Sequence, residues 1–267
     1  MIKFFRKIRQ RLLTENKFSK YLLYAIGEIV LVVIGILIAL QINNWNENRK
    51  AQVQERASIK EVIENLKYDI IRCEKNIESN TAYVNGIDSL RTSVGNTIDG
   101  LDKTIDIYYY SSKYGIDFSS AALNRSAYNQ LIGSGTVKLM ENRTVMFNLS
   151  DYYERIATSI PENAPITGLS NMQSIQKKLI SFKQLEGYIQ SFDSINPVNF
   201  SVNYNHKNIL KMKNLELLNY NKVSLNEYYN EISQYEIDLK TYMFYLSWVK
   251  DAAEDLILEI KKEYQIK

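Results

Sequence analysis

The feature that most constrains this chain is an apolar run near its N-terminus, "YLLYAIGEIVLVVIGILIAL", which occupies residues 21–40. A helix of this length rises about 30 Å, which is the thickness of the hydrocarbon core of a bilayer. Tyr21 and Tyr24 mark one end of the run and Trp45 marks the other, as aromatic residues do at membrane interfaces. The run therefore predicts a transmembrane helix over residues 21–45.

The flanking sequence predicts an uncleaved anchor with a defined direction. The run is longer than the apolar region of a signal peptide, and residues 41–44 offer no small-x-small cleavage site. Seven Lys and Arg residues lie in the twenty positions before the run, and four lie in the twenty after it. By the positive-inside rule, residues 1–20 are expected in the cytoplasm and residues 46–267 outside it.

The N-terminal segment carries a second membrane signal. In "IKFFRKIRQRLL", residues 2–13, four apolar side chains share one helical face and basic side chains fill much of the rest. This pattern is typical of a helix that lies on an anionic lipid surface, and a merely basic cytoplasmic segment is the alternative. The basic residues concerned are Lys3, Arg6, Lys7, Arg9 and Arg11.

One acidic residue, Glu28, interrupts the apolar run. A charge near the centre of a bilayer costs about 2.5 to 3.5 kcal/mol on insertion scales, and less toward the edge. At 100° per residue, Glu28 shares a helix face with Gly35 and Ala39, and Leu31 and Val32 lie alongside. The spacing of Gly35 and Ala39 permits close approach of a second helix. Three roles stay open for Glu28: a tolerated neutral acid in a monomeric anchor, a helix–helix contact, or a proton or ion pathway.

Two long amphipathic helices are expected in the remainder. No glycine or proline occurs between Gly35 and Gly86, so the transmembrane helix is free to continue into a first helix over residues 46–95. Apolar residues recur there in steps of four and three from Ile59 to Ile77. The same spacing runs from Leu225 to Ile260 and predicts a last helix over residues 224–263, with Ser224 and Glu227 as a capping box.

Shorter helices are predicted between these two. They cover residues 119–132, 146–160, 172–192 and, more weakly, 208–218, and no alternating strand pattern competes with them. The sequence thus predicts an all-α exported domain in which the first and last helices pack antiparallel and the middle helices complete a bundle. A parallel coiled coil between subunits is the rival use of the same apolar stripes.

The sequence carries no recognisable catalytic, cofactor or metal motif. It has no nucleophile elbow, phosphate-binding loop or zinc signature, and the net charge of +3 is too small to indicate nucleic acid as a partner. His206 lies in a polar stretch and is expected to be an exposed, solvated side chain. Cys73 occupies a heptad position, which predicts a buried small side chain, or alternatively a disulfide between subunits.

Three stretches carry a family resemblance. The N-terminal segment with "FFRKIRQ", "YAIGEI" and "GILIALQINNWNE" resembles the signature of an uncharacterised family of bacterial single-pass membrane proteins that is plentiful in Bacteroidota. The stretches "SAYNQLIGSG" (126–135) and "NRTVMFNLSDYYE" (142–154) are similar to a second, looser block of that family. The resemblance implies an inner-membrane anchor with a helical periplasmic domain, and it places Glu28 within the family pattern.

These observations lead to one expected function and two alternatives. We expect a non-enzymatic interaction or sensing protein, anchored in the bilayer, that works with a membrane-protein partner through the Glu28 face. One alternative is a structural spacer or homo-oligomeric scaffold of the envelope. The other is an enzyme that acts on envelope material, which would need paired carboxylates in a cleft between helices. No cofactor or metal is expected.

Overall fold

The computed structural model describes residues 18–135, 142–161, 163–185, 192–195, 202–204 and 206–266, and these residues are predominantly helical. The elements follow in the order α2 (Phe18–Ile98), α3 (Thr104–Tyr114), α4 (Ser126–Gly133), α5 (Arg143–Asp151), the π-helical turn η2 (Tyr152–Ile156), α6 (Asn163–Leu179), the 3₁₀ turn η3 (Phe182–Leu185), β1 (Phe192–Ile195), β2 (Val202–Tyr204), the 3₁₀ turn η4 (His206–Lys211) and α8 (Lys222–Glu263).

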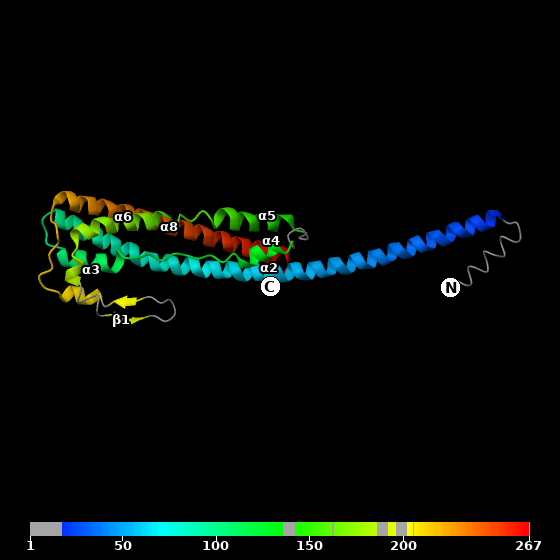
Figure 1. Ribbon diagram of the computed structural model, residues 1–267, viewed down its shortest axis with the longest axis horizontal. Helices are drawn as coiled ribbons and strands as arrows, with labels where there is room; N and C mark the ends of the chain where they lie inside the picture. The colour runs from blue at the N-terminus through cyan, green and yellow to red at the C-terminus, as the bar shows by residue number, and fades with distance from the viewer. Residues whose placement is uncertain are drawn as a thin grey trace.

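Helix α2 is one unbroken helix of 81 residues. Its N-terminal part projects away from the other elements, and its C-terminal part lies among them (Figure 1). From position 26 to position 50 every side chain is exposed except that of Glu28, which is half-buried. We call residues 26–50 the bare stretch. From Glu55 onward the same helix contributes buried side chains, so one helix belongs both to the bare stretch and to the folded part of the chain.

Helix α8 runs alongside the folded part of α2 in the opposite direction (Figure 1). Arg56 near the start of this part contacts Tyr264 at the end of α8, and Arg91 near its end contacts Glu236 in the first half of α8. The side chains between the two helices are fully buried at Ile59 and Leu66 on α2. Burial of each large aliphatic side chain contributes about 1.5–3 kcal/mol, so this contact is a main source of the stability of the fold.

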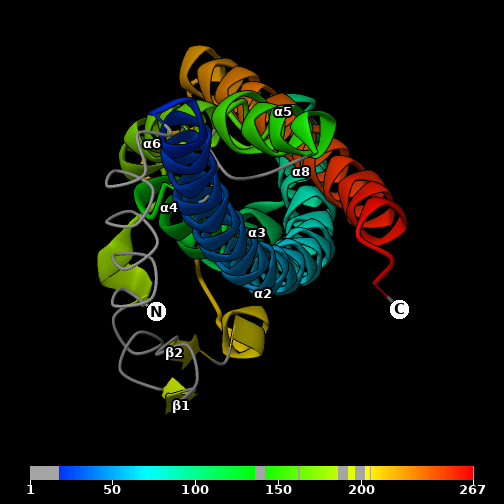
Figure 2. The same ribbon diagram turned by 90° about the vertical axis from the view of Figure 1, so that its right-hand side faces the viewer.

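The shorter helices cover the remaining sides of this pair. Helices α3 and α4 contact α2, whereas α5, η2 and α6 contact α8. Buried side chains form two clusters along the pair, one around Leu66 and Leu246 and one around Ile87 and Tyr235. The β1–β2 pair is antiparallel, and it lies outside the group of helices when the structure is viewed along its length (Figure 2).

The helix predicted over residues 119–132 begins only at Ser126. The preceding segment is extended because polar side chains of α2 bind its backbone. Asn80 accepts a hydrogen bond from the Ser119 amide and donates one to the Ser119 carbonyl, at 3.0 and 2.8 Å. Asp69 accepts one from the Asn124 amide at 2.6 Å. Backbone groups that are bonded in this way cannot close helical turns, so the prediction was wrong for residues 119–125.

The helix predicted over residues 172–192 was also wrong at both ends. Helix α6 begins earlier, at Asn163, and ends at Leu179. The Leu179 carbonyl accepts a hydrogen bond from the Leu218 amide at 2.8 Å, and the Tyr108 hydroxyl accepts one from the Ser181 amide at 2.9 Å. Phe192 then belongs to β1 instead of a helix. Contacts with distant residues therefore outweigh the local helical pattern here.

Two smaller expectations near the last helix also need correction. The weak helix predicted over residues 208–218 is the short 3₁₀ turn η4. The N-cap of α8 is Asn221, whose side chain accepts a hydrogen bond from the Val223 amide at 2.9 Å. The predicted cap Ser224 lies inside the helix and accepts a hydrogen bond from Asn219 instead. An asparagine is as good an N-cap as a serine, so the helix starts one turn earlier than the capping box indicated.

Candidate functional site

The face predicted for helix association lies in the bare stretch of α2. Leu31 is 71% exposed and Val32 is 55% exposed, and a Cβ atom added to Gly35 would meet no atom within 4 Å. Ala39 is exposed as well. This part of α2 contains the one helix stretch, among the described residues, that is long and apolar enough to cross a membrane, with mean hydropathy 2.6 over 18 residues, none of them buried. The predicted basic residues lie outside the described part of the chain: Lys3, Arg6, Lys7, Arg9 and Arg11.

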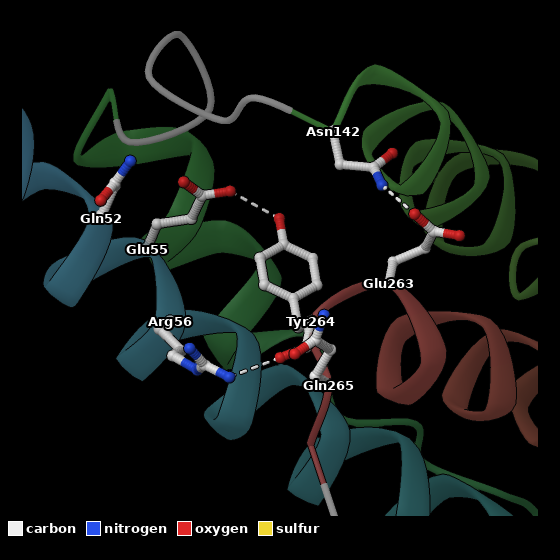
Figure 3. A pocket seen from close by; sticks show the side chains of 7 residues that line it. All are labelled: Gln52, Glu55, Arg56, Asn142, Glu263, Tyr264 and Gln265. Atoms are coloured by element: carbon white, nitrogen blue, oxygen red, sulfur yellow. Dashed lines mark hydrogen bonds between the residues drawn. The ribbon is translucent and has the colours of Figure 1, made fainter.

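A pocket of about 530 Å³ lies where the bare stretch meets the helical bundle (Figure 3). We call it the basal pocket. Residues of α2, the N-cap of α5 and the end of α8 line it, and these elements are far apart in the sequence. The lining residues are Gln52, Glu55, Arg56, Asn142, Glu263, Tyr264 and Gln265.

Hydrogen bonds at this pocket fasten the end of α8 to α2 (Figure 3). The Tyr264 hydroxyl donates to Oε1 of Glu55 at 2.5 Å, and Nη2 of Arg56 donates to the Tyr264 carbonyl at 2.6 Å. Asn142 donates to Glu263 at 2.9 Å and so adds α5 to the same junction. Glu55 is only 5% exposed, so its carboxylate depends on this partner in place of water. The polar residues of the pocket therefore hold the end of α8 and the start of α5 against α2.

A second cluster of polar groups lies inside the bundle, around Asp69. Its side chain is fully buried, and it accepts hydrogen bonds from the Asn124 amide and from the Tyr152 hydroxyl, the latter at 3.2 Å. Burial raises the pKa of Asp69 to about 6, and the two hydrogen bonds oppose that rise. Cys73 lies one turn further on and is buried as predicted. Burial and, to a smaller extent, the charge of Asp69 raise the pKa of its thiol to about 12.

Two consecutive tyrosines of the π-helical turn η2, Tyr152 and Tyr153, are both buried at this cluster. Tyr152 and Tyr153 are 1% and 0% exposed. The Tyr153 ring stacks on that of Tyr128, with 4.5 Å between centroids, and its hydroxyl has no hydrogen-bond partner within the described part of the chain. Asp69 and these tyrosines are not open to solvent, so a dissolved substrate does not reach them while the bundle is closed.

His206 differs from its expected environment. It begins η4 and is half-buried, whereas the polar sequence around it indicated an exposed side chain. Burial and, to a smaller extent, the nearby charge of Lys113 lower its pKa to about 4. Sequence reasoning missed this because the burial comes from residues distant in the chain. In the described ranges, no group of three or more His, Cys, Asp and Glu side chains has an arrangement that could hold a metal ion.

The comparison with known families confirms the coarser expectation, that of a family of unknown function. The sequence profile of a family of unknown function, DUF6090, matches residues 28–196. The chain belongs to this family. A comparison with curated proteins finds no match. A comparison with solved structures finds none either.

The matched range shows which features of this DUF6090 chain lie within the family profile. It begins at Glu28, and it includes residues 28–50 of the bare stretch and the buried cluster around Asp69. Helix α8 lies outside it, so the basal pocket joins matched residues of α2 to unmatched ones such as Tyr264. The family description supplies no activity.

Proposed function

We propose that this DUF6090 protein is a non-enzymatic, single-pass protein of a bacterial inner membrane. Residues 21–45 would span the bilayer, residues 1–20 would lie in the cytoplasm, and residues 46–267 would form a periplasmic helical module. The module would bind a partner or ligand and work with a membrane protein through the face of Glu28, Leu31 and Gly35. The observation that carries this proposal is that α2 is continuous between the bare stretch and the bundle.

The exposure of the apolar run supports a lipid environment. Twelve aliphatic side chains between positions 22 and 40 are 47–71% exposed. Since burial of such a side chain contributes about 1.5–3 kcal/mol, leaving all twelve in water is unfavourable by on the order of 20 kcal/mol. A bilayer removes this cost, and the run has the length that a bilayer requires.

The continuity of α2 supports a role in interaction or sensing. Neither glycine nor proline interrupts the helix between Gly35 and Gly86, so there is no hinge residue between the predicted span and the bundle. A ligand or partner that changes the packing of the bundle would therefore change the position of the apolar segment as well. A second membrane protein in contact with the Glu28 face would receive such a signal.

Cysteine labelling in cells tests the anchor and its direction. Lys7→Cys and Lys262→Cys place the same substitution on the two predicted sides of the membrane, and the buried Cys73 of the parent chain provides the background. We expect a membrane-impermeant maleimide to label Lys262→Cys in intact spheroplasts and Lys7→Cys only after lysis. Labelling of both variants before lysis, or recovery of the chain in the soluble fraction, would overturn the proposal.

A further inference from the structure

A seven-residue count along α2 shows a regular series of buried positions. Starting at Ile59 and moving toward the C-terminus in steps of seven, each residue reached is 0% exposed. The series consists of Ile59, Leu66, Cys73, Asn80, Ile87 and Val94. In a heptad labelled a to g, these are d positions, and α8 runs along this part of α2. The a and d positions thus form a seam in the folded part of the helix.

The same count continues without a break into the bare stretch. Moving from Ile59 toward the N-terminus, it reaches Gln52 and then Trp45, Ile38 and Leu31, which are 64%, 54% and 71% exposed. These three residues occupy the same heptad position as the buried series, but their side chains are exposed. The reason is the length of α8, which ends at Glu263 beside the basal pocket. The seam of α2 therefore extends further than the helix that covers it.

We propose that the α2 helix of a second copy of this chain covers the exposed seam, in parallel and in register, from Leu31 through Trp45 to Arg49. This inference rests on the membrane anchor proposed above, and it names a second copy of the chain as the membrane protein that contacts Leu31 and Gly35. Two copies that are inserted in the same direction present the same residues at the same depth. A parallel two-fold contact then places each a and d residue against its own counterpart.

The residues beside the seam suit pairing between identical helices. In a parallel pair the e and g positions face each other across the seam, and like charges there would repel. The e and g positions beyond the apolar run hold uncharged amides, at Gln41, Asn46 and Asn48. The charged side chains of Glu47 and Lys50 occupy the outward positions f and b. The pattern therefore avoids charge repulsion in a symmetric dimer.

The a positions agree with this arrangement inside and outside the bilayer. Gly35 permits close approach of two helices within the apolar run, and Ile42 continues the apolar seam beyond it. Glu28, seven residues before Gly35, occupies the a position just outside the paired stretch. Arg49 is the exception within the paired stretch, since two guanidinium groups would lie near each other. Its guanidinium lies 5.9 Å from the ring centroid of Trp45, and a contact of this kind turns the charge toward an aromatic face.

Helix propensity gives an independent reason for a partner along this stretch. Residues 43–48 include four asparagines, at positions 43, 44, 46 and 48, and asparagine is a poor helix former. An isolated helical segment of about 12 residues is marginal in water even with better residues. A second helix along the Trp45 side would supply the packing that the segment lacks.

Disulfide crosslinking of the full chain in its native membrane tests the dimer. Trp45→Cys and Ile38→Cys place a thiol at a d position, and Glu47→Cys and Leu40→Cys are matched controls at the outward f position two residues later. The parent chain, with only the buried Cys73, sets the background. Under mild oxidation we expect a band at twice the mass of the chain for the two d variants and background levels for the two f variants. Two differently tagged copies should both be present in that band.

The outcomes separate this proposal from the anchor on which it rests. Equal crosslinking at d and f positions, a band of another mass, or no band from a chain that fractionates with the membrane would overturn the dimer and leave the anchor intact. Recovery of the chain in the soluble fraction would overturn both. Because one d variant lies inside the apolar run and the other lies beyond it, loss of fold in one of them does not remove the test.

Discussion

The hydroxyl of Tyr264 lies 2.5 Å from a carboxylate oxygen of Glu55, although the two residues are 209 positions apart. Glu55 belongs to α2 at the point where the bare stretch ends, and Tyr264 follows the last residue of α8. Their hydrogen bond joins the far end of α8 to the helix that leads to the predicted membrane segment. Because the Glu55 side chain is buried, this bond replaces part of the hydration that its carboxylate loses on folding.

Replacement of Tyr264 with Phe should destabilise the bundle. The change removes the donor and leaves a buried acid without that partner, which costs about 1–3 kcal/mol. Thermal or urea unfolding of the full chain in detergent, followed by circular dichroism, measures the effect. Tyr68→Phe is the control, because the Tyr68 side chain is 42% exposed and the hydrogen bond that its hydroxyl accepts from Arg72 is easily replaced by water. Equal stability of the two variants would contradict the structural role of Tyr264.

The raised pKa of Asp69 predicts a gain of stability in mild acid. Its pKa rises from 3.8 in the unfolded chain to about 6 in the folded one, so the folded state binds the proton more tightly. The contribution of Asp69 to stability therefore increases as the pH falls through 6, is complete below 3.8, and is lost again as the pH rises. Asp69→Asn should remove this dependence. The difference between parent and variant in unfolding free energy should change by about 1–3 kcal/mol between pH 7.5 and pH 4.5.

The stability of the parent chain is compared with that of Asp69→Asn because other acidic groups also change protonation as the pH falls. Hydrogen bonds donated by Thr104 and Arg155 lower the pKa values of Asp102 and Asp151, respectively, and these acids oppose the effect of Asp69. They are the same in parent and variant, so their contributions cancel. Parallel pH profiles for the two chains would show that the acid does not titrate in the range given by its burial.

His206 offers a direct spectroscopic measurement, because it is the only histidine in the chain. Its lowered pKa means that the neutral imidazole is favoured in the folded state. A proton NMR titration of the ring Cε1–H signal should give a midpoint near 4 for the folded chain and near 6.5 after unfolding in urea. The sign of the shift predicts that this group disfavours folding as the pH falls below 6.5. A folded-state midpoint near 6.5 would mean that the imidazole is well solvated.

Two substitutions of Glu28 should have different effects on the association of α2 with a neighbouring helix. Gln keeps a hydrogen-bonding side chain of similar size, whereas Leu removes every polar atom. Interhelical hydrogen bonds in membranes contribute about 0.6–2 kcal/mol, so Glu28→Leu should weaken association with a neighbouring helix about threefold to thirtyfold. Glu28→Gln should retain most of it. Co-purification of differently tagged copies measures the change, and undiminished recovery of the Leu variant would argue for a tolerated acid that faces lipid.

A substitution at Gly86 tests the packing of α3 against α2. A Cβ atom at this position would lie 2.1 Å from the ring of Tyr114, so Gly86→Ala forces the ring to move. We expect a loss of about 1–3 kcal/mol in unfolding free energy, as is usual for added volume in a packed contact. Gly133→Ala is the matched control, since a Cβ atom there would meet no atom within 4 Å. Similar stability of both variants would show that Tyr114 has room to turn away.

Periodicity predicted the long helices because their apolar residues repeat over many turns. The steps of three and four around Ile63 and Tyr242 leave no competing secondary structure, and both residues are buried in the fold. The extended segment before Ser126 was not predictable in this way. Its conformation depends on Asn80 and Asp69, which belong to another helix and whose partners cannot be read from local spacing. Phe192 was misassigned for the same reason, since it pairs with Tyr204 across a strand contact.

The candidate sites differ in the same way: one follows from the local sequence, and the others depend on contacts between distant residues. The exposed face around Leu31 and Gly35 follows from composition and helical geometry, so the sequence could indicate it. The basal pocket could not be predicted, because it depends on the meeting of α2, the start of α5 and the end of α8. Asp69 gave only a weak signal, an acid beside a heptad core position, and its burial became visible only with the packing of Tyr152.

The unbroken course of α2 also fixes a rotational phase between the bundle and the apolar run. In a continuous helix, one inserted residue turns everything on its far side by about 100° and moves it by about 1.5 Å, whereas seven residues nearly restore the original direction. The number of residues between Leu40 and Glu55 therefore sets the direction in which the apolar run faces relative to the bundle, as well as the distance between them. A chain with one residue more or fewer there would keep both of its parts, but it would aim Glu28 toward a different neighbour.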